Sequence, residues 1–423
     1  MTPESIQPKY TPEEIIAKLQ AHPKFGSQIK PITKHQSAII SSGLEPAVVI
    51  AGAGSGKTET MSNRVLYLVA NGFATPDQIL GLTFTRKAAG ELSVRIRKRL
   101  RQLSQLPEFK HITSTSTAVT TYHSYAGKLL SEHAIRYGID ADAEPLGEAA
   151  IWQIASDVVR NWSDDSYRND SAVSTVIKDL LGLSKLMLEH QVKAADIEAI
   201  GNEMLEKLQL LAGSTNEDTR AVARAMRQRN SLLPMVEAFM ERRKAAGELS
   251  FDDQMSLAAD IAMKFPDVAA IERGKYAVVL LDEYQDTSQS QVRLLSALFG
   301  NGHPVTAVGD PCQSIYTWRG ASAGTIGSFG EYFPKAKGST GSEIYELLTT
   351  FRNDVAILDL ANVISSQVRS LGNLNVSELT PRPGAGKGDL AVGLFETMEA
   401  EGTAIAEYIA PLWNDPQRLV ETS

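Results

Sequence analysis

The chain has 423 residues, a formal net charge of -8 and a single cysteine, Cys312, which excludes an intrachain disulfide and fits a reducing cytoplasm. At roughly 100–200 residues per domain, this length predicts two to four domains. No apolar stretch approaches the roughly 18 residues that span a bilayer and no leader peptide opens the chain, so we expect a cytoplasmic protein with no membrane partner. The acidic balance argues against non-specific binding of polyanions, but it is compatible with a local basic channel.

The first predicted elements are helices. Residues 1–30 contain several prolines and are predicted to form an extension with one short helix, from Glu13 to Gln20. From Ile32 the pattern predicts a capped amphipathic helix with Thr33 as its N-cap. Gln36 lies in this helix, where a polar residue needs no special role.

A glycine-rich loop, A-G-A-G-S-G-K-T, follows the apolar run Ala47–Ile50 and precedes a helix predicted from Glu59 to Val69. A strand, a glycine loop and a helix start form an anion cradle, because backbone N–H groups converge on one point. In such a loop Lys57 would reach the β- and γ-phosphates of a nucleotide and Thr58 would hold Mg²⁺. A purely structural glycine turn is the alternative. The predicted nucleotide-binding positions of the loop are Ala51, Gly52, Ala53, Gly54, Ser55, Gly56, Lys57 and Thr58.

Further runs resemble buried parallel strands and alternate with helical patterns. Strands are predicted at 79–84, 118–122, 276–282 and 304–310, and a long helical stretch without strong strand runs separates the second from the third. The helix predicted from Arg86 to Arg101 has a strongly basic side, for which a solvated helix face is the simplest explanation. Together these patterns predict an α/β protein with an all-helical insertion.

An acidic pair ends the third strand run, in the sequence L-L-D-E-Y-Q-D from Leu280 to Asp286. Ligands of an open α/β sheet bind at this end of its strands. Asp282 can therefore hold Mg²⁺ through its water shell, and Glu283 can orient and deprotonate an attacking water. The alternative is a charged turn after a strand.

These motifs occur with others in a characteristic order. The succession consists of Gln36, 51–58, Leu82–Ala89, Thr121–Tyr125, Asp282–Asp286, Val308–Ala321 and Leu348–Arg352. It resembles the UvrD/Rep-like branch of superfamily-one DNA helicases. The resemblance implies a RecA-like P-loop NTPase motor domain with a helical insertion, followed by a second RecA-like domain. The implied divisions are an N-terminal extension (1–30), the first part of the motor domain (31–123), the helical insertion (124–271), the second part of the motor domain (272–342) and an incomplete second RecA-like domain (343–423).

The resemblance also implies roles at the nucleotide. Gln36 resembles the glutamine that reads adenine, since its amide can both donate and accept. Gln313 resembles the γ-phosphate sensor, and Arg352 resembles the arginine that reaches the γ-phosphate from the second domain. Phe351 occupies the position of an aromatic stacked on adenine, and Arg64 resembles an arginine on the other face of that base.

A second set of positions resembles the family's path for single-stranded DNA. Its members are Phe84, Tyr122, His123, Tyr316, Trp318 and Arg319. Aromatic faces beside phosphate-binding groups suit a path that accepts any base, although burial in the core is the alternative for each aromatic residue alone. Tyr316 and Trp318 favour the stacking interpretation, because they alternate with polar residues and border Arg319.

Several features depart from the stand-alone helicases. Pro311 and Cys312 replace a common acidic pair, and the stretch Gly320–Gly324 extends this motif. Both features resemble the helicase-nuclease branch, such as the AdnB-like motor subunits of actinobacteria. Because nothing after Arg352 resembles the family's last two motifs, we expect the chain to be the N-terminal portion of a longer protein.

The expected function is that of an ATP-dependent DNA helicase and translocase, moving 3′ to 5′ by family resemblance, in repair or recombination. ATP and Mg²⁺ are the expected cofactors. Single-stranded and duplex DNA are the expected partners, with a second helicase-nuclease subunit as a further partner in the AdnB-like case. The alternative is an ATP-gated DNA-binding or regulatory module without productive unwinding.

Overall fold

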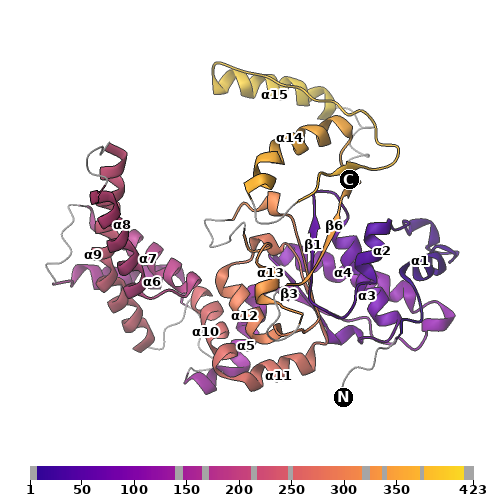
Figure 1. Ribbon diagram of the computed structural model, residues 1–423, viewed down its shortest axis with the longest axis horizontal. Helices are drawn as coiled ribbons and strands as arrows, with labels where there is room; N and C mark the ends of the chain where they lie inside the picture. Colours follow the sequence, from indigo (N-terminus) through magenta and orange to yellow (C-terminus); the bar gives the residue numbers. More distant parts are fainter. Residues whose placement is uncertain are drawn as a thin grey trace.

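A parallel β-sheet organises the protein in the computed structural model, which describes residues 7–138, 146–163, 171–210, 217–245, 251–316, 324–335, 341–371 and 376–413. The strands are β1 (Ala47–Ala51), β2 (Ile79–Thr83), β3 (Ala118–Thr121), β4 (Val278–Leu281), β5 (Val305–Gly309) and β6 (Glu343–Leu347). Their order across the sheet is β3-β2-β4-β5-β1-β6, with every neighbouring pair parallel (Figure 1). The α/β class and the first five strands confirm the prediction.

The strand order decides where functional groups can meet. β4, β5 and β1 are adjacent, with Val48 of β1 opposite Ala307 of β5 and Leu281 of β4 opposite the same residue. Because parallel strands end at one edge, the segments that follow these three strands emerge side by side. Those segments are the glycine loop, the acidic pair and the start of the 308–321 motif.

Helices cover both faces of the sheet, and alternate strand residues point to opposite cores. Val49 and Ala51 join the core beneath α1 (Pro12–Gln20), α2 (Lys34–Ile40), α3 (Lys57–Ala70) and α4 (Arg86–Leu103). Val48 and Ile50 join the other core. That core also contains residues of α5 (Tyr122–His133), α10 (Phe251–Lys264), α11 (Pro266–Lys275), α12 (Gln289–Phe299) and α13 (Phe329–Tyr332).

The N-terminal segment is more than an extension. The predicted short helix is confirmed as α1, which Thr11 begins with a capping box. Its apolar residues Ile15, Ile16 and Leu19 are buried in the same core as α3 and α4. This segment is therefore part of the sheet domain.

The stretch predicted to form a helical insertion contains a core separate from the sheet. Its separate core lies between α6 (Glu148–Arg160), α7 (Val173–His190) and α9 (Glu217–Ala245), and α8 (Ala194–Leu210) packs on α9. These four helices stand away from the sheet in Figure 1. By contrast, α5 and α10 bury apolar stripes against the sheet, including Tyr125, Leu129 and Met255. α5 and α10 therefore share the core of the sheet, although they lie largely within residues 124–271.

The segment predicted to open a second domain at residue 343 begins with a strand of the first sheet, β6. β6 pairs with β1 along its whole length, from Glu343 opposite Ala47 to Leu347 opposite Ala51. The physical reason is that the edge of β1 not occupied by β5 needs a hydrogen-bonding partner. The sheet domain therefore continues at least to Leu347.

After Leu347 the described residues form only a short strand ladder and two helices, and they expose many apolar side chains. A two-residue ladder joins β7 (Thr349–Thr350) to β8 (Thr380–Pro381), and the helices α14 (Val355–Leu371) and α15 (Met398–Trp413) follow the outside of the molecule (Figure 1). Many large apolar side chains of this segment are exposed, among them Val363, Ile364, Val392, Leu394, Met398 and Trp413. Among the described residues, no helix is long and apolar enough to cross a membrane.

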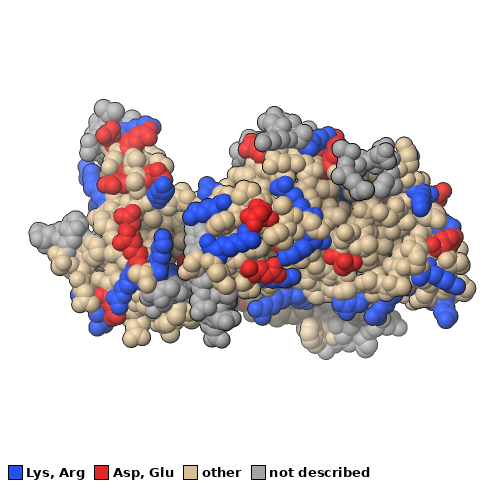
Figure 2. Space-filling view, turned by 90° about the horizontal axis from the view of Figure 1, so that it is seen from below, with Lys and Arg blue, Asp and Glu red and all other residues tan. Residues whose placement is uncertain are grey.

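Charge is distributed in small patches. Figure 2 shows Lys and Arg interspersed with Asp and Glu on the face seen from below. The net charge of -8 is therefore not gathered into one acidic field on that face.

Candidate nucleotide-binding and catalytic site

The glycine loop links β1 to α3 through backbone conformations that favour glycine. Gly54 has φ 75° and Gly56 has φ 87°, in the left-handed region. Gly56 is the N-cap residue of α3, so Lys57 and Thr58 open the helix. The N–H groups at this helix start have no helical carbonyl partner, which suits them to an anion.

A segment distant in sequence packs directly on this loop. The Thr350 hydroxyl donates to the carbonyl oxygen of Ala53 at 2.9 Å, and the Phe351 N–H donates to that of Gly54 at 2.9 Å. A Cβ on Gly54 would lie 2.5 Å from the Cβ of Arg352. Arg352 and Phe351 therefore lie beside the loop, and the Phe351 side chain is exposed.

Gln36 lies at the other side of the loop. It is the third residue of α2, where it completes a capping box with Thr33 and is 6% exposed. Its carboxamide oxygen accepts from the Thr33 N–H at 3.0 Å. Its amide nitrogen lies 2.9 Å from the position that a Cβ on Gly56 would take, so its donor group borders the predicted phosphate loop.

Arg64 has a different position from the one predicted. It is 1% exposed, and its guanidinium donates to the carbonyl oxygens of Ile39, Ile40, Ser42 and Gly43. Its Nε donates to the Thr306 hydroxyl at 3.1 Å, and burial lowers the pKa of Arg64 to about 10. These contacts satisfy the end of α2 and fix that helix to α3. Arg64 therefore stabilises the fold next to the site. Its buried guanidinium has no exposed face on which a base could stack.

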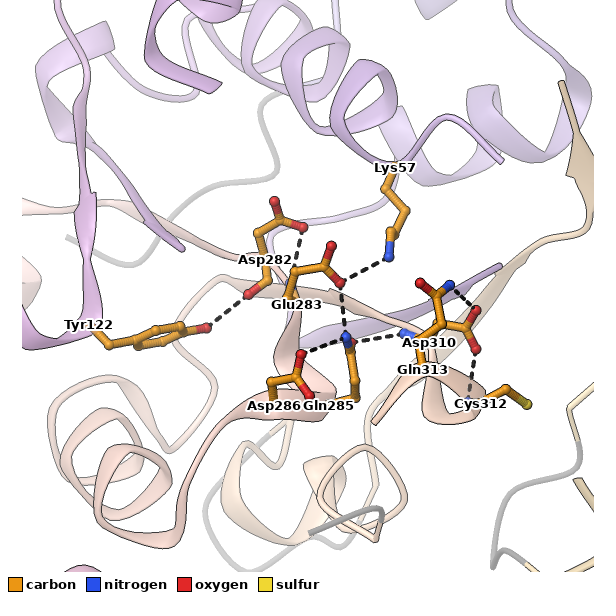
Figure 3. A network of polar contacts seen from close by, with 9 residues as sticks. All are labelled: Lys57, Tyr122, Asp282, Glu283, Gln285, Asp286, Asp310, Cys312 and Gln313. Atoms are coloured by element: carbon orange, nitrogen blue, oxygen red, sulfur yellow. Dashed lines mark hydrogen bonds and ion pairs between the residues drawn. The ribbon is translucent and has the colours of Figure 1, made fainter. Parts of the chain in front are cut away.

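Lys57 and Glu283 form an ion pair at the centre of the site (Figure 3). The Lys57 Nζ lies 2.9 Å from Glu283 Oε2. Glu283 follows β4 with φ 49°, a conformation uncommon for a side chain with a Cβ. This turn directs its carboxylate toward the start of α3, as Figure 3 shows.

Gln285 connects the acidic segment to the end of β5, and the sequence analysis gave it no role. Its amide donates to Glu283 Oε2 at 2.9 Å and to Asp286 Oδ2 at 3.2 Å, while its oxygen accepts from the Asp310 N–H at 3.0 Å. Asp310 in turn accepts from Gln313 Nε2 at 2.6 Å. One chain of hydrogen bonds therefore joins Lys57 to Gln313. The signal in the sequence was a glutamine two residues after Glu283, on the strand edge where polar groups meet.

Burial perturbs the carboxyl groups of this segment. It raises the pKa of Asp282 to about 6, with a further contribution from the charge of Glu283. Burial and the same neighbour raise the pKa of Asp286 to about 6. Asp282 Oδ1 accepts from the Glu283 N–H at 3.0 Å. Bringing a cation near these groups would favour their ionised forms.

Tyr122 is a core residue and not part of an exposed strand path. It is 2% exposed, and its hydroxyl donates to the carbonyl oxygen of Asp282 at 3.3 Å. Burial raises the pKa of the Tyr122 hydroxyl. Tyr122 belongs to the same core as Leu281 of β4, the strand that precedes the acidic pair, which explains its burial.

The remaining path residues are only partly described. Phe84 and Tyr316 stack on each other, with ring centroids 4.9 Å apart and planes 23° from parallel. His123 is exposed near the start of α5. Trp318 and Arg319 lie outside the described residues. The structure therefore brings one predicted aromatic pair together at the carboxyl edge of β2 and β5.

The residues fit a nucleotide with Mg²⁺. The buried Ser55 hydroxyl has no hydrogen-bond partner within the described part of the chain, and it lies in the loop where phosphate oxygens would accept from it. Thr58 supplies a hydroxyl and Asp282 a carboxylate, the oxygen ligands that Mg²⁺ prefers.

Comparison with known proteins gives the family. The model of the UvrD/REP helicase N-terminal domain matches residues 32–334. The chain belongs to this family. The match covers the glycine loop, the acidic pair and the β5 motif, which are the segments that build the site.

Similar UvrD/REP proteins are longer than this chain. An ATP-dependent DNA helicase UvrD1 from Mycobacterium tuberculosis (strain ATCC 25618 / H37Rv) is 30% identical over 387 residues, covering 90% of this chain and 44% of the relative. An ATP-dependent DNA helicase PcrA from Staphylococcus epidermidis (strain ATCC 12228 / FDA PCI 1200) is 27% identical over 337 residues, covering 79% of this chain and 40% of the relative. The chain thus spans less than half the length of these relatives.

Proposed function

We propose that this protein is an ATP-hydrolysing DNA motor, a 3′ to 5′ helicase and translocase of repair or recombination. The observation that carries the proposal is the hydrogen-bonded chain from Lys57 through Glu283 and Gln285 to Gln313. It joins Lys57, Glu283 and Gln313, to which we assign phosphate binding, general-base catalysis and contact with the γ-phosphate, in one network. The names of the relatives, ATP-dependent DNA helicases, support the same activity.

Each residue has a distinct role in this proposal. Lys57 leaves Glu283 to bind the β- and γ-phosphates, and the released Glu283 carboxylate accepts a proton from the attacking water. Thr58 and Asp282 hold Mg²⁺, which neutralises phosphate charge when bound. Gln36 binds the base, Gln313 contacts the γ-phosphate, and Phe351 contacts adenine.

In this proposal, ATP hydrolysis is coupled to DNA movement through the segment that contacts the glycine loop. We assign the sheet domain as a RecA-like motor domain and the segment after Leu347 as the beginning of a second one. Thr350 and Phe351 contact the loop backbone, so a shift of that segment would move Arg352 relative to the phosphates. Phe84, His123, Tyr316, Trp318 and Arg319 would contact single-stranded DNA.

An ATP-gated DNA-binding module without unwinding is the second candidate. The exposed apolar surface after Leu347 favours it for this chain, because domain closure needs a well-packed second body. An AdnB-like protein with a second helicase-nuclease subunit is the further proposal, supported by Pro311 and Cys312.

Steady-state ATP hydrolysis tests the proposal. We expect Mg²⁺-dependent turnover that single-stranded DNA stimulates, with directional displacement of a protein block at one end of the strand. Glu283→Gln serves as the inactive control. Stimulated turnover without displacement would support the second candidate, and the absence of any Mg²⁺-ATP turnover or binding would contradict both.

A further inference from the structure

A cavity of about 480 Å³ lies on the sheet domain between the N-terminal segment and α4. Its lining residues are Lys24, Phe25, Gln28, Val94, Arg97, Lys98, Arg101, Gln102 and Gln105. They include four cations and no carboxylate. The proposed motor activity uses none of them.

The cavity shares no lining residue with the site centred on Lys57 or with the proposed strand path. Arg95 and Arg99, on an adjacent side of α4, reach Glu59 at the start of α3. The cavity is therefore a distinct set of residues, on a helix that also contacts the helix opened by Lys57.

The two basic sides of α4 differ in their partners. Arg95 and Arg99 both form ion pairs with Glu59 of α3. Within the described part of the chain, no ion pair involves Arg97, Lys98 or Arg101, and Lys98 contacts only the neutral Gln28, at 3.4 Å. The Glu59 carboxylate thus offsets part of the positive charge on one side of the helix, whereas no described carboxylate forms an ion pair with α4 on the cavity side.

The cavity also has an apolar element. Phe25 is 6% exposed and forms part of its wall, while Val94 is 63% exposed at its side. The aliphatic stems of the surrounding Lys and Arg side chains add apolar surface. A phosphodiester backbone has no apolar group to bury here, whereas an aliphatic side chain would remove this surface from water.

We propose that this cavity binds an acidic segment of a partner protein, with an aliphatic side chain in the cavity and flanking carboxylates on Lys24, Arg97, Lys98 and Arg101. Arginine presents a planar fork of donors that matches a carboxylate. The glutamine amides at 28 and 105 can bind the peptide backbone. Charge complementarity sets both the affinity and its salt dependence.

The test is fluorescence anisotropy with the whole chain and a labelled peptide in which one leucine has two glutamates on each side. We expect saturable binding that weakens with salt, weakens when serine replaces the leucine, and falls at least tenfold in Arg97→Glu/Arg101→Glu. These side chains are exposed, so the variant should fold and keep its basal ATP binding. Arg220→Glu/Arg224→Glu is the matched control, because it reverses two exposed charges four residues apart on α9, and it should bind the peptide normally.

Duplex DNA is the competing ligand in this experiment. We expect its binding to be the same in the wild type and in Arg97→Glu/Arg101→Glu. Equal peptide binding by these two proteins would overturn the proposal, as would loss of duplex binding in the variant with no effect on the peptide. The latter result would make the cavity a phosphate-backbone site.

Discussion

At the carboxyl edge of the sheet, Lys57 and Glu283 belong to a continuous network of hydrogen bonds, whereas Phe84 and Tyr316 contact each other by ring stacking. The first region is built from charged groups whose positions are fixed by many partners. The second is built from aromatic faces that a base could separate. We infer that the first region determines turnover and the second determines affinity for DNA, and each substitution below should affect mainly one of the two.

The largest expected effect belongs to Glu283→Gln. The amide keeps the size of the side chain but cannot accept the proton of water, so ATP turnover should fall by about 10³-fold, within the range for general bases. Mg²⁺-ATP binding should persist. Rapid-quench hydrolysis and equilibrium binding measure the two effects, and loss of binding together with turnover would show that Glu283 is instead a metal ligand or a structural residue.

Arg64→Met should destabilise the part of the sheet domain that carries the glycine loop. It should leave the residues proposed to contact DNA unchanged. It removes five hydrogen bonds and leaves buried carbonyl groups at the end of α2 without donors. The free energy of unfolding should fall by about 3 kcal/mol. Urea denaturation measures it, with the exposed Arg95→Met as the control. An unchanged midpoint would contradict the structural role of Arg64.

Tyr316→Ala should weaken single-stranded DNA binding by about 1–3 kcal/mol, the usual contribution of one stacked base. ATP turnover without DNA should change little, because the Tyr316 ring stacks on the ring of Phe84 and the proposed hydrolysis uses neither side chain. Tyr408→Ala, on the exposed face of α15, is the control. Unchanged DNA affinity in Tyr316→Ala would show that the aromatic pair stabilises the fold and does not bind DNA.

The smallest expected effect is a pH dependence of Mg²⁺-ATP affinity. The pKa of Asp282 is raised to about 6, so the carboxylate needed for Mg²⁺ is lost as the pH falls through that value. Between pH 7.5 and 5.5 the ionised fraction falls about fourfold, and affinity should follow. The terminal phosphate of ATP titrates in the same range, so Asp282→Asn is the control that lacks only the contribution of Asp282. The same pH dependence of Mg²⁺-ATP affinity in both proteins would contradict the metal role of Asp282.

The same raised pKa has a consequence for folding. Because the folded protein holds the Asp282 proton more tightly than the unfolded chain does, this group stabilises the fold most below about pH 4. Its contribution decreases as the pH rises through 6. The direction is the reverse of that for a salt-bridged carboxylate.

Local patterns predicted much of this molecule. Apolar β-branched runs marked β1 to β5, and the glycine spacing marked the loop with Lys57, because strand pairing and left-handed backbone impose these residues locally. The acidic pair with Glu283 was placed near Lys57 because ligands of an open α/β sheet bind at the carboxyl ends of its strands. The place of Gln313 came from the resemblance to UvrD/Rep-like helicases.

Local patterns did not predict which side chains are buried by segments distant in the sequence. Tyr122 and Arg64 occupy motif positions, but their side chains point into the protein, where carbonyl groups from other segments accept from them. β6 was assigned to a second domain because its pairing with β1 depends on residues nearly three hundred positions away. Gln285 was missed because its contact with Asp310, which completes the network, is formed only when β4 and β5 are adjacent.

Lys57 is the residue on which the assignment of a nucleotide-binding site in the sheet domain depends most directly. Equilibrium titration of a fluorescent ATP analogue with Mg²⁺ tests it in wild type and in Lys57→Ala, with circular dichroism to establish that both are folded. We predict micromolar to millimolar affinity for the wild type, typical of such sites, and a loss of at least tenfold in the variant. Equal affinity in the two folded proteins would contradict the assignment of this loop as the phosphate-binding site.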